Sequence, residues 1–396
     1  MSQSPLQLGS ITGVRVGCAA GGFAAAGRDD FAMFAFANPT ASAAVFTTNQ
    51  FCAAPVIVAK EHLHKSAGLS RAWIINSGKA NCGTGAAGEA TARASCAAAA
   101  AALGCKPEQV LPFSTGVVME TIDSAKLCRA TKQAAAAAQP EGWPDAAAAI
   151  MTTDTRPKGA CATSPCGRFK INGIAKGAGM IHPRMATMLA FIATDAPASP
   201  GQLAEMLQPA VATTFNQISV DGDTSTNDAV MLGATGAGSL TDADAGSLAD
   251  AVHGVCAALA GAILADGEGC TRTAAVSVAG FGSDDNCRLI AEAVACSPLV
   301  KTMLNAGDPN LGRLLMAIGK AGVTLQQEAV TISIGGQLAF ANGQRVADFS
   351  EQQARELFAV ENVAIDITGG GDEGNYCCRF TDLSAEYVRI NGQYRS

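Results

Sequence analysis

One threonine, Thr187, stands where a loop-like segment meets a strand-like one. The surrounding stretch from Ala175 to Asp195 reads AKGAGMIHPRMATMLAFIATD. Glycines and a proline exclude a regular helix in its first half, and the apolar run 188–193 predicts a buried strand. A hydroxyl at this junction, preceded by the small Ala186, is suited to attack the preceding carbonyl. The pattern is compatible with self-cleavage between Ala186 and Thr187, but the residues of this stretch alone favour an ordinary turn before a strand.

Cleavage there would change the chemistry of Thr187. An N-to-O acyl shift followed by ester hydrolysis leaves this threonine with a free α-amino group. Such an amine has an unperturbed pKa of about 7.7–8.0 and can act as the base for its own hydroxyl. A single residue would then supply both nucleophile and base.

The sequence contains no convincing motif for a phosphate-binding, dinucleotide-binding or metal-binding site. Lys176–Gly179 lacks the spacing of a phosphate-binding loop, and no dinucleotide fingerprint opens a helix. Metal sites need paired ligands at close spacing. The nearest candidates, none of which qualifies, are Cys161 with Cys166, Cys377 with Cys378, and His62 with His64. We therefore expect neither a metal nor a cofactor.

Periodicity and composition predict a mixed α/β chain without internal repeats. Helices are expected at the alanine clusters 97–102, 134–138 and 146–149, at Pro200–Phe215, at 246–265, and from Ser350 with Gln353 completing a capping box. Strands are expected at Trp73–Ile75, Met188–Ala193, Val363–Ile367 and Tyr387–Ile390. Segment 156–170, with two prolines and two glycines, is the most loop-like stretch before Thr187.

Composition narrows the class of protein. The 396 residues suffice for a roofed pocket, and 48% hydrophobic with 15% charged residues argues against disorder. A net charge of −7 argues against nucleic acid as the main partner. The densest alanine run, Ala94–Leu103, is too short to cross a membrane, and no leader pattern opens the chain. The fourteen scattered cysteines are expected to be buried free thiols.

The stretch Lys176–Asp195 closely resembles the self-processing signature of the ornithine acetyltransferases of arginine biosynthesis, also called the glutamate N-acetyltransferase family. Similar stretches follow the same order along nearly the whole chain. They are Ala44–Asn49, Ala53–Val56, Asn76–Asn81, Ser114–Val117, Met151–Thr155, Ser219–Asp228, Asp266–Gly269, Ser297–Thr302, Asp308–Asn310 and Ile390–Ser396.

The resemblance implies a reaction and an architecture. N-acetyl-L-ornithine would acetylate Thr187, and L-glutamate would then remove the acetyl group; acetyl-CoA as a second donor is left open. The fold would be an α/β sandwich of the ornithine acetyltransferase and self-cleaving aminopeptidase type, with a smaller second α/β region. Residues 1–186 would become an α chain and 187–396 a β chain, folded together, in a cytoplasmic α2β2 assembly.

The resemblance also assigns roles near the reacting centre. Thr115 and Gly116 match the oxyanion hole, where a hydroxyl and a backbone N–H converge on one point. Lys176 matches a lysine that contacts substrate; a solvated loop lysine is the alternative. Glu268 matches the carboxylate that holds an ammonium group of ornithine, with Asp266 as its rival.

The remaining matches lie further along the chain. Thr152 matches a substrate-binding threonine, and we prefer it to the adjacent Thr153. Asn391 and Ser396 match the last two binding residues, which requires the C-terminal tail to fold over the pocket. The pattern gives His182 no role as a base, and we interpret Cys270 as a packing residue.

Two other classes of protein remain as alternatives. A self-processed aminopeptidase would free an internal nucleophile in the same way but pass its acyl group to water. A non-catalytic relative would keep the fold without processing. The set of matched positions favours the transferase over both.

Overall fold

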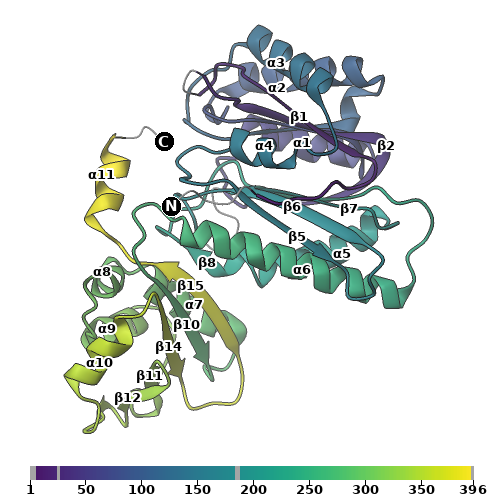
Figure 1. Cartoon of the computed structure of the whole chain (residues 1–396). Coiled ribbons are helices and arrows are strands. Elements are labelled where there is room, and N and C mark those ends of the chain that lie inside the picture. Colours follow the sequence, from purple (N-terminus) through teal and green to yellow (C-terminus); the bar gives the residue numbers. More distant parts are fainter. Residues whose placement is uncertain (1–5, 25–26, 183–187, 394–396) are drawn as a thin grey trace.

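The computed structural model describes residues 6–24, 27–182 and 188–393, and these form two β-sheets with helices packed on them (Figure 1). The eight-stranded sheet has the order β4-β3-β2-β9-β7-β6-β5, and β1 pairs with β2. Its strands are β1 (Val14–Ala19), β2 (Phe31–Phe46), β3 (Leu69–Asn76), β4 (Val110–Ser114), β5 (Lys158–Thr163), β6 (Lys170–Lys176), β7 (Leu189–Thr194) and β9 (Ala229–Ala234).

Strand β2 joins the two halves of this sheet. Its first part pairs with β3 and its last part with β9, and the register of the β3 pairing shifts between Ala35 and Thr40. The halves enclose an aromatic core in which Phe34 lies near Trp73 and stacks on Phe191 at 5.6 Å between ring centroids. The sheet therefore forms a sandwich, as expected from the sequence.

Helices cover both outer faces of the sandwich (Figure 1). On one side lie α2 (Gly85–Leu103) and α3 (Ser124–Ala137), with α1 (Ala54–Lys65) and α4 (Trp143–Ala149) nearby; on the other lie α5 (Pro200–Ala212) and α6 (Asp242–Ala265). The predicted alanine clusters fall in α2, α3 and α4, where small side chains permit close packing.

The second, smaller unit is a seven-stranded sheet with its own apolar core. Its order is β13-β12-β11-β14-β10-β15-β8. The strands are β8 (Ile218–Ser219), β10 (Thr273–Ala279), β11 (Thr331–Ile334), β12 (Gln337–Ala341), β13 (Gln344–Arg345), β14 (Asn362–Thr368) and β15 (Asn375–Thr381). The helices beside it are α7 (Asp284–Ala295), α8 (Pro298–Ala306), α9 (Leu311–Gly319) and α10 (Glu351–Phe358).

Most predicted elements are confirmed, with shifted ends. The strands at 73–75, 188–193 and 363–367 lie within β3, β7 and β14, apart from Met188, which precedes β7. Helix α6 begins at Asp242 because Thr241 caps it, and α5 ends at Ala212. Ser350 and Gln353 form the expected capping box of α10.

The predicted strand Tyr387–Ile390 is wrong, because these residues lie in α11 (Ala385–Gln393). The β-branched and aromatic residues gave a strand signal too short to outweigh the local helix signals. Ser384 Oγ accepts the N–H of Tyr387, and Glu386 pairs with Arg389 one turn later. Such local contacts override weak β propensity.

The loop predicted over 156–170 is wrong for residues 158–163 and 170, and confirmed for the residues before and between them. Residues 158–163 form β5, which pairs antiparallel with β6, and the connection between these strands holds Pro165 and Gly167. Gly159 lies inside the strand, where a Cβ atom would come within 2.7 Å of Leu6. The glycine there marks a close approach and not a loop.

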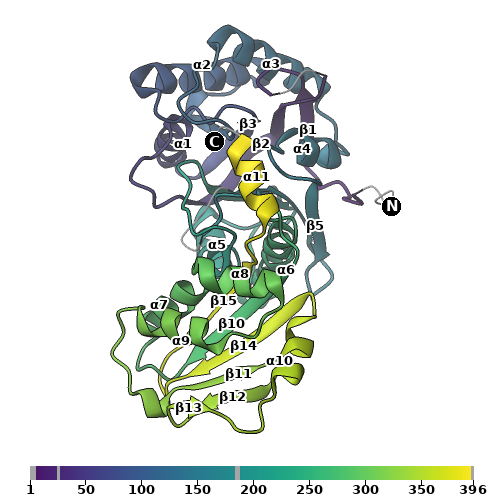
Figure 2. The ribbon, with the colours of Figure 1, turned by 90° about the vertical axis from the view of Figure 1, so that its left-hand side faces the viewer.

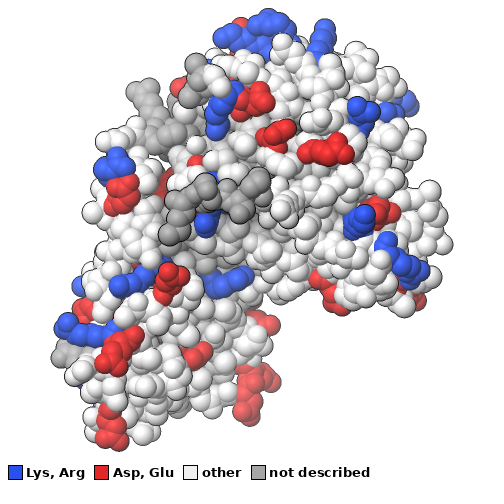
Figure 3. Space-filling model, in the orientation of Figure 1, with Lys and Arg blue, Asp and Glu red and all other residues white. Residues whose placement is uncertain are grey.

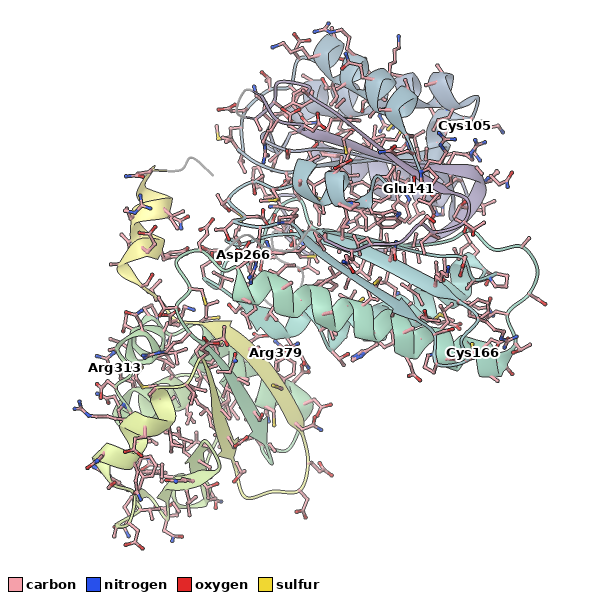
Figure 4. The ribbon with its side chains drawn as sticks, viewed as in Figure 1. Cys105, Glu141, Cys166, Asp266, Arg313 and Arg379 are labelled. Carbon is pink, nitrogen blue, oxygen red and sulfur yellow. The ribbon has the colours of Figure 1, made fainter. Side chains whose placement is uncertain are left out.

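The cysteines are free thiols, as expected, but they are not uniformly buried. Five are buried, whereas Cys161 and Cys166 are exposed. Figure 4 places Cys166 at the end of the sandwich remote from Asp266. The expectation of burial was wrong at these two positions because both lie on or beside the β5–β6 turn.

Helix α6, with 24 residues, is apolar and long enough to cross a membrane, and the bent pair α7–α8 would qualify only if taken as one span. The buried residues of α6 pack on β5, β6 and α5 in the sandwich core, which is typical of a core helix. On the face in Figure 3, basic and acidic side chains are interspersed.

Candidate active site

The segment expected to carry the chemistry connects two neighbouring strands. β6 and β7 are antiparallel, with Lys176 opposite Leu189, so the chain between them leaves and returns at one edge of the sheet. The expected cleavage residues Ala186 and Thr187 lie outside the described residues. The described ends of this connection, Lys176–His182 and Met188, show what surrounds it.

A polar pocket opens at this edge of the sheet. Every predicted site residue that the structure describes lines it. Its lining consists of Thr115, Gly116, Thr152, Thr153, Lys176, Gly179, Met180, Asp221, Asp223, Glu268, Tyr387 and Asn391. The sandwich supplies most of these residues, and α11 supplies Tyr387 and Asn391. In Figure 2, α11 reaches from the second unit across the front of the sandwich.

Lys176 is buried, with 2% of its surface exposed, so the alternative of a solvated loop lysine is excluded. Its Nζ donates a hydrogen bond to Thr115 Oγ1 at 3.2 Å. Burial lowers the pKa of Lys176, and the carboxylates of Asp154, Asp228 and Glu268 oppose that shift. The lysine places a positive charge beside the predicted oxyanion turn.

The turn at Thr115 and Gly116 has a strained backbone that only glycine fits. Gly116 has φ of +126°, and a Cβ atom there would lie 2.2 Å from the Gly78 carbonyl carbon. Thr115 N donates to Asn76 O at 2.9 Å, whereas Gly116 N–H has no hydrogen-bond acceptor among the described residues. In the part of the chain that the structure describes, an N–H without an acceptor and a buried hydroxyl therefore lie side by side.

Asn227 ties this turn to the strand beside β7. It is buried, and its Nδ2 donates to Ser114 O at 2.9 Å and to Ala80 O at 2.6 Å. The next residue, Asp228, accepts the N–H of Met188 at 2.9 Å through Oδ1. These two consecutive residues connect the turn at Thr115 to the residue that precedes β7.

The structure separates the two rival carboxylates. Asp266 ends α6 (Figure 4) and accepts hydrogen bonds from Thr155 and, at 2.5 Å, from Lys158 Nζ. It does not line the pocket, whereas Glu268 does. Because Asp266 is engaged by Lys158, Glu268 is the carboxylate available to a ligand.

Glu268 is held at the pocket by close backbone contacts. Its N–H donates to Ala178 O at 2.8 Å, and its Oε2 accepts from Asn391 Nδ2 at 2.7 Å. A Cβ atom on Gly179 would lie 2.4 Å from the Glu268 carboxyl, so a larger residue there would displace this carboxylate. The carboxylate faces the pocket with 8% of the residue surface exposed.

Asp154 does not line the pocket itself but holds residues on the other side of it in place. Its Oδ2 accepts the N–H of Thr152 at 3.0 Å, and its Oδ1 accepts from Gly177 N and Lys158 Nζ. Burial alone would raise its pKa, but the charges of Lys176 and Lys158 dominate and lower it to about 2. Thr152 and Thr153 both line the pocket, so the preference for Thr152 remains a prediction.

Helix α11 forms one wall of the pocket and is held there by two hydrogen bonds. Besides the bond from Asn391 to Glu268, Tyr387 OH donates to Asp221 Oδ2 at 3.2 Å. Residues 385–393 thus fold back over the pocket as expected, and Ser396 lies outside the described residues.

The sequence reasoning missed several lining residues: Gly179, Met180, Asp221, Asp223 and Tyr387. Asp221 accepts the N–H groups of Met180 at 2.6 Å and Ile181 at 2.9 Å, which fixes the chain ahead of the expected cleavage point. Burial raises the pKa of Asp221 to about 6. Its position in the matched stretch 219–228 was the available signal.

His182 and Cys270 have the surroundings of packing residues. His182 Nδ1 lies 3.4 Å from Cys296 Sγ, and neither His182 nor Cys270 lines the pocket. Burial raises the pKa of Cys270 to about 12, which disfavours a reactive thiolate. Within the described ranges, no group of three His, Cys, Asp or Glu residues is placed to hold a metal ion.

Comparison with known proteins gives a consistent match over the chain. A family model described as the ArgJ family matches residues 15–396. The arginine biosynthesis bifunctional protein ArgJ of Methylococcus capsulatus is 44% identical over 401 residues, covering 99% of this chain and 98% of that protein. The protein of the same name from Neisseria meningitidis serogroup A is 45% identical over 403 residues, covering 98% and 97%.

Solved structures were also found. The arginine biosynthesis bifunctional protein of Bacillus halodurans has 35% identity and a TM-score of 0.48, covering 50% of this chain and 96% of that one. The ornithine acetyltransferase of Mycobacterium tuberculosis complexed with ornithine has 33% identity and a TM-score of 0.42, covering 46% and 97%.

Proposed function

The chain belongs to the ArgJ family, and from this membership together with the pocket we propose that it is an acyltransferase of arginine biosynthesis. It transfers the acetyl group of N-acetyl-L-ornithine to L-glutamate in two half-reactions, with acetyl-Thr187 between them. One observation carries the proposal: Thr115, Gly116, Lys176 and Glu268 line a single pocket at the β6–β7 edge.

Self-cleavage between Ala186 and Thr187 prepares the enzyme. It yields an α chain of residues 1–186 and a β chain of residues 187–396, which begins with the nucleophile. The new α-amine takes the hydroxyl proton of Thr187 as its Oγ attacks the acetyl carbonyl. The hydrogen bonds that fix Met180, Ile181 and Met188 support this step, because they hold the chain on both sides of the proposed cleavage point.

Each half-reaction passes through a tetrahedral oxyanion. The hydroxyl of Thr115 and the N–H of Gly116 donate hydrogen bonds to this oxygen, and Lys176 adds a positive charge. Donors fixed in a buried site stabilise such charge more than water does, because they need no reorganisation. The N–H of Gly116, for which no described residue provides an acceptor, and the burial of Lys176 support this assignment.

Charged groups recognise the two amino acids. Glu268 holds an ammonium group of ornithine, and Lys176 pairs with a substrate carboxylate. Thr152, Asn391 and Ser396 complete the binding set. The contact of Asn391 with Glu268 and the position of Thr152 in the lining support two of these assignments.

The curated relatives are named bifunctional, which supports acetyl-CoA as a second donor to glutamate. We place the enzyme in the cytoplasm as an α2β2 assembly without a metal or other cofactor. Nucleic acid and membrane have no part in the reaction.

The test is a pair of measurements on the purified chain. Intact mass should show two chains divided before Thr187, and Thr187→Ala should remain one chain while Thr187→Ser is still cleaved. Acetylglutamate should form from N-acetylornithine and glutamate together. Release of free acetate, or of amino acids from peptides, without acetylglutamate would instead identify the hydrolase alternative.

A further inference from the structure

A buried carboxyl beside the proposed nucleophile has an oxygen without a partner. Asp228 is 1% exposed and directly precedes β9. Its Oδ1 accepts the N–H of Met188, but Oδ2 has no hydrogen-bond partner among the described residues. Leaving a buried polar atom unpaired is costly, so this oxygen requires an explanation.

The position of Asp228 follows from the pairing of two strands. β7 and β9 are parallel neighbours with Leu189 opposite Ala229, so Met188 and Asp228 lie side by side at one edge. The nitrogen that Asp228 holds belongs to the peptide bond between Thr187 and Met188. Covalent geometry alone therefore keeps the α-nitrogen of Thr187 within roughly 7 Å of Asp228 Oδ1.

Among the described residues, no cationic side chain forms a salt bridge or hydrogen bond with this carboxyl. Burial raises the pKa of Asp228 well above its usual value, and the hydrogen bond from Met188, the neighbouring Ser225 and the charge of Lys176 on β6 only partly oppose that shift. The Ser225 hydroxyl accepts the N–H of Asn227 but makes no hydrogen bond to Asp228 Oδ2. Lys176 itself bonds to Thr115 and is balanced first by Asp154. Thr47 binds the backbone oxygen of Asp228 and leaves the carboxyl untouched.

We propose that Asp228 is a positioning residue whose Oδ2 accepts a hydrogen bond from the α-amino group that cleavage creates on Thr187. The inference rests on the proposed function, because this amine exists only when the chain is cut before Thr187. Asp228 would then bind the two backbone nitrogens on either side of the Thr187 Cα. Its Oδ1 accepts from Met188 N, and its Oδ2 would accept from the α-amine of Thr187.

The proton balance of the first half-reaction fits this role. The neutral amine takes the hydroxyl proton of Thr187 as Oγ bonds to the acetyl carbon. The resulting ammonium then gives this proton to the departing nitrogen of ornithine as the C–N bond breaks. The new ammonium beside Asp228 keeps this buried carboxyl ionised despite its raised pKa, so Asp228 stabilises the transient ammonium and neither gains nor loses a proton.

The test is Asp228→Asn, which keeps one oxygen for Met188 and removes the negative charge. The variant should still be cleaved. Because a carboxylate raises the pKa of a neighbouring amine, the acidic limb of its kcat/KM profile should move down by about one pH unit. We expect kcat to fall by roughly 10- to 100-fold. Asp382→Asn, which changes a buried aspartate bonded to Thr271, should move neither quantity.

The outcomes separate this inference from the proposed function. A cleaved Asp228→Asn enzyme with the wild-type acidic limb overturns the inference, and so does a folded variant that is not cleaved, because Asp228 would then act before the amine exists. If Asp228→Asn does not fold, Asp228→Ser should show the same shift. A wild-type chain that stays uncut contradicts the proposed function itself.

Discussion

At the scale of single residues, the pocket depends on charges that burial would otherwise neutralise. The ammonium of Lys176 is tolerated because the carboxylate of Asp154 lies near it and is itself fixed by Lys158 and Gly177. Removing one member of such a buried set leaves the others uncompensated, which costs more than the net value of the intact set. These residues therefore affect folding as well as binding.

Asp154→Asn should reveal this coupling through pH. The folded pKa of Asp154 is about 2, below its ordinary 3.8, so its ionisation stabilises the fold above pH 4 and this contribution disappears as the pH falls through 2. Linkage puts it at about 2 kcal/mol. Unfolding by denaturant between pH 2 and 7 should show the stability of the variant converging on that of the wild type at the acidic end. A constant difference would contradict this.

Thr115→Val should isolate the oxyanion contribution. The substitution keeps the volume of the side chain and removes the hydroxyl, so kcat should fall by about 10²–10³ with a small change in KM. Thr131→Val is the matched control, since Thr131 is also buried but bonds only within α3. Equal losses in both variants would count against an oxyanion role.

At the scale of elements, the site depends on how separate segments are fixed to one another. Asn227 joins the turn after β4 to the beginning of β9, which is the parallel neighbour of β7. The proposed oxyanion turn and the strand that follows the proposed nucleophile are therefore rigidly connected. Small misplacements of reacting groups reduce rates strongly.

Asn227→Ala should loosen this connection. We expect a fall in kcat of about 10²-fold with KM for glutamate nearly unchanged, because no substrate contact is lost. Asn216→Ala, in the short 3₁₀ helix Phe215–Gln217 before β8, serves as a control outside the pocket lining. A change confined to KM would show that Asn227 acts on binding.

Some helices, strands and site residues could be predicted from the sequence and others could not. Strands with a continuous apolar run, such as β7, were predictable because burial on both faces fixes their composition. The helix at Tyr387 was not, because its local capping by Ser384 competes with a four-residue strand pattern. Asp221 was missed because its role depends on Met180 and Ile181, which are distant in sequence.

At the scale of the whole molecule, the expected cleavage would not divide the structure into two bodies. β7 and β9 follow Thr187 in sequence, yet they lie between β2 and β6, which precede it. The second unit, by contrast, comes wholly from residues after Thr187. The two chains would share one sheet and one core.

The two chains should consequently stay together after cleavage. We expect them to co-elute in gel filtration and to unfold in one transition of the shared sandwich, because neither half can bury its apolar face alone. Denaturing electrophoresis should separate them. Elution of a free chain under native conditions would contradict this arrangement.

The most direct test of the central claim is to trap the enzyme between its half-reactions. Incubation with N-acetylornithine in the absence of glutamate should increase the mass of the chain beginning at Thr187 by one acetyl group, which peptide mapping places on that residue. Adding glutamate should remove it and yield acetylglutamate. An unmodified chain that still forms acetylglutamate, or an acetyl group on another residue, would contradict the account.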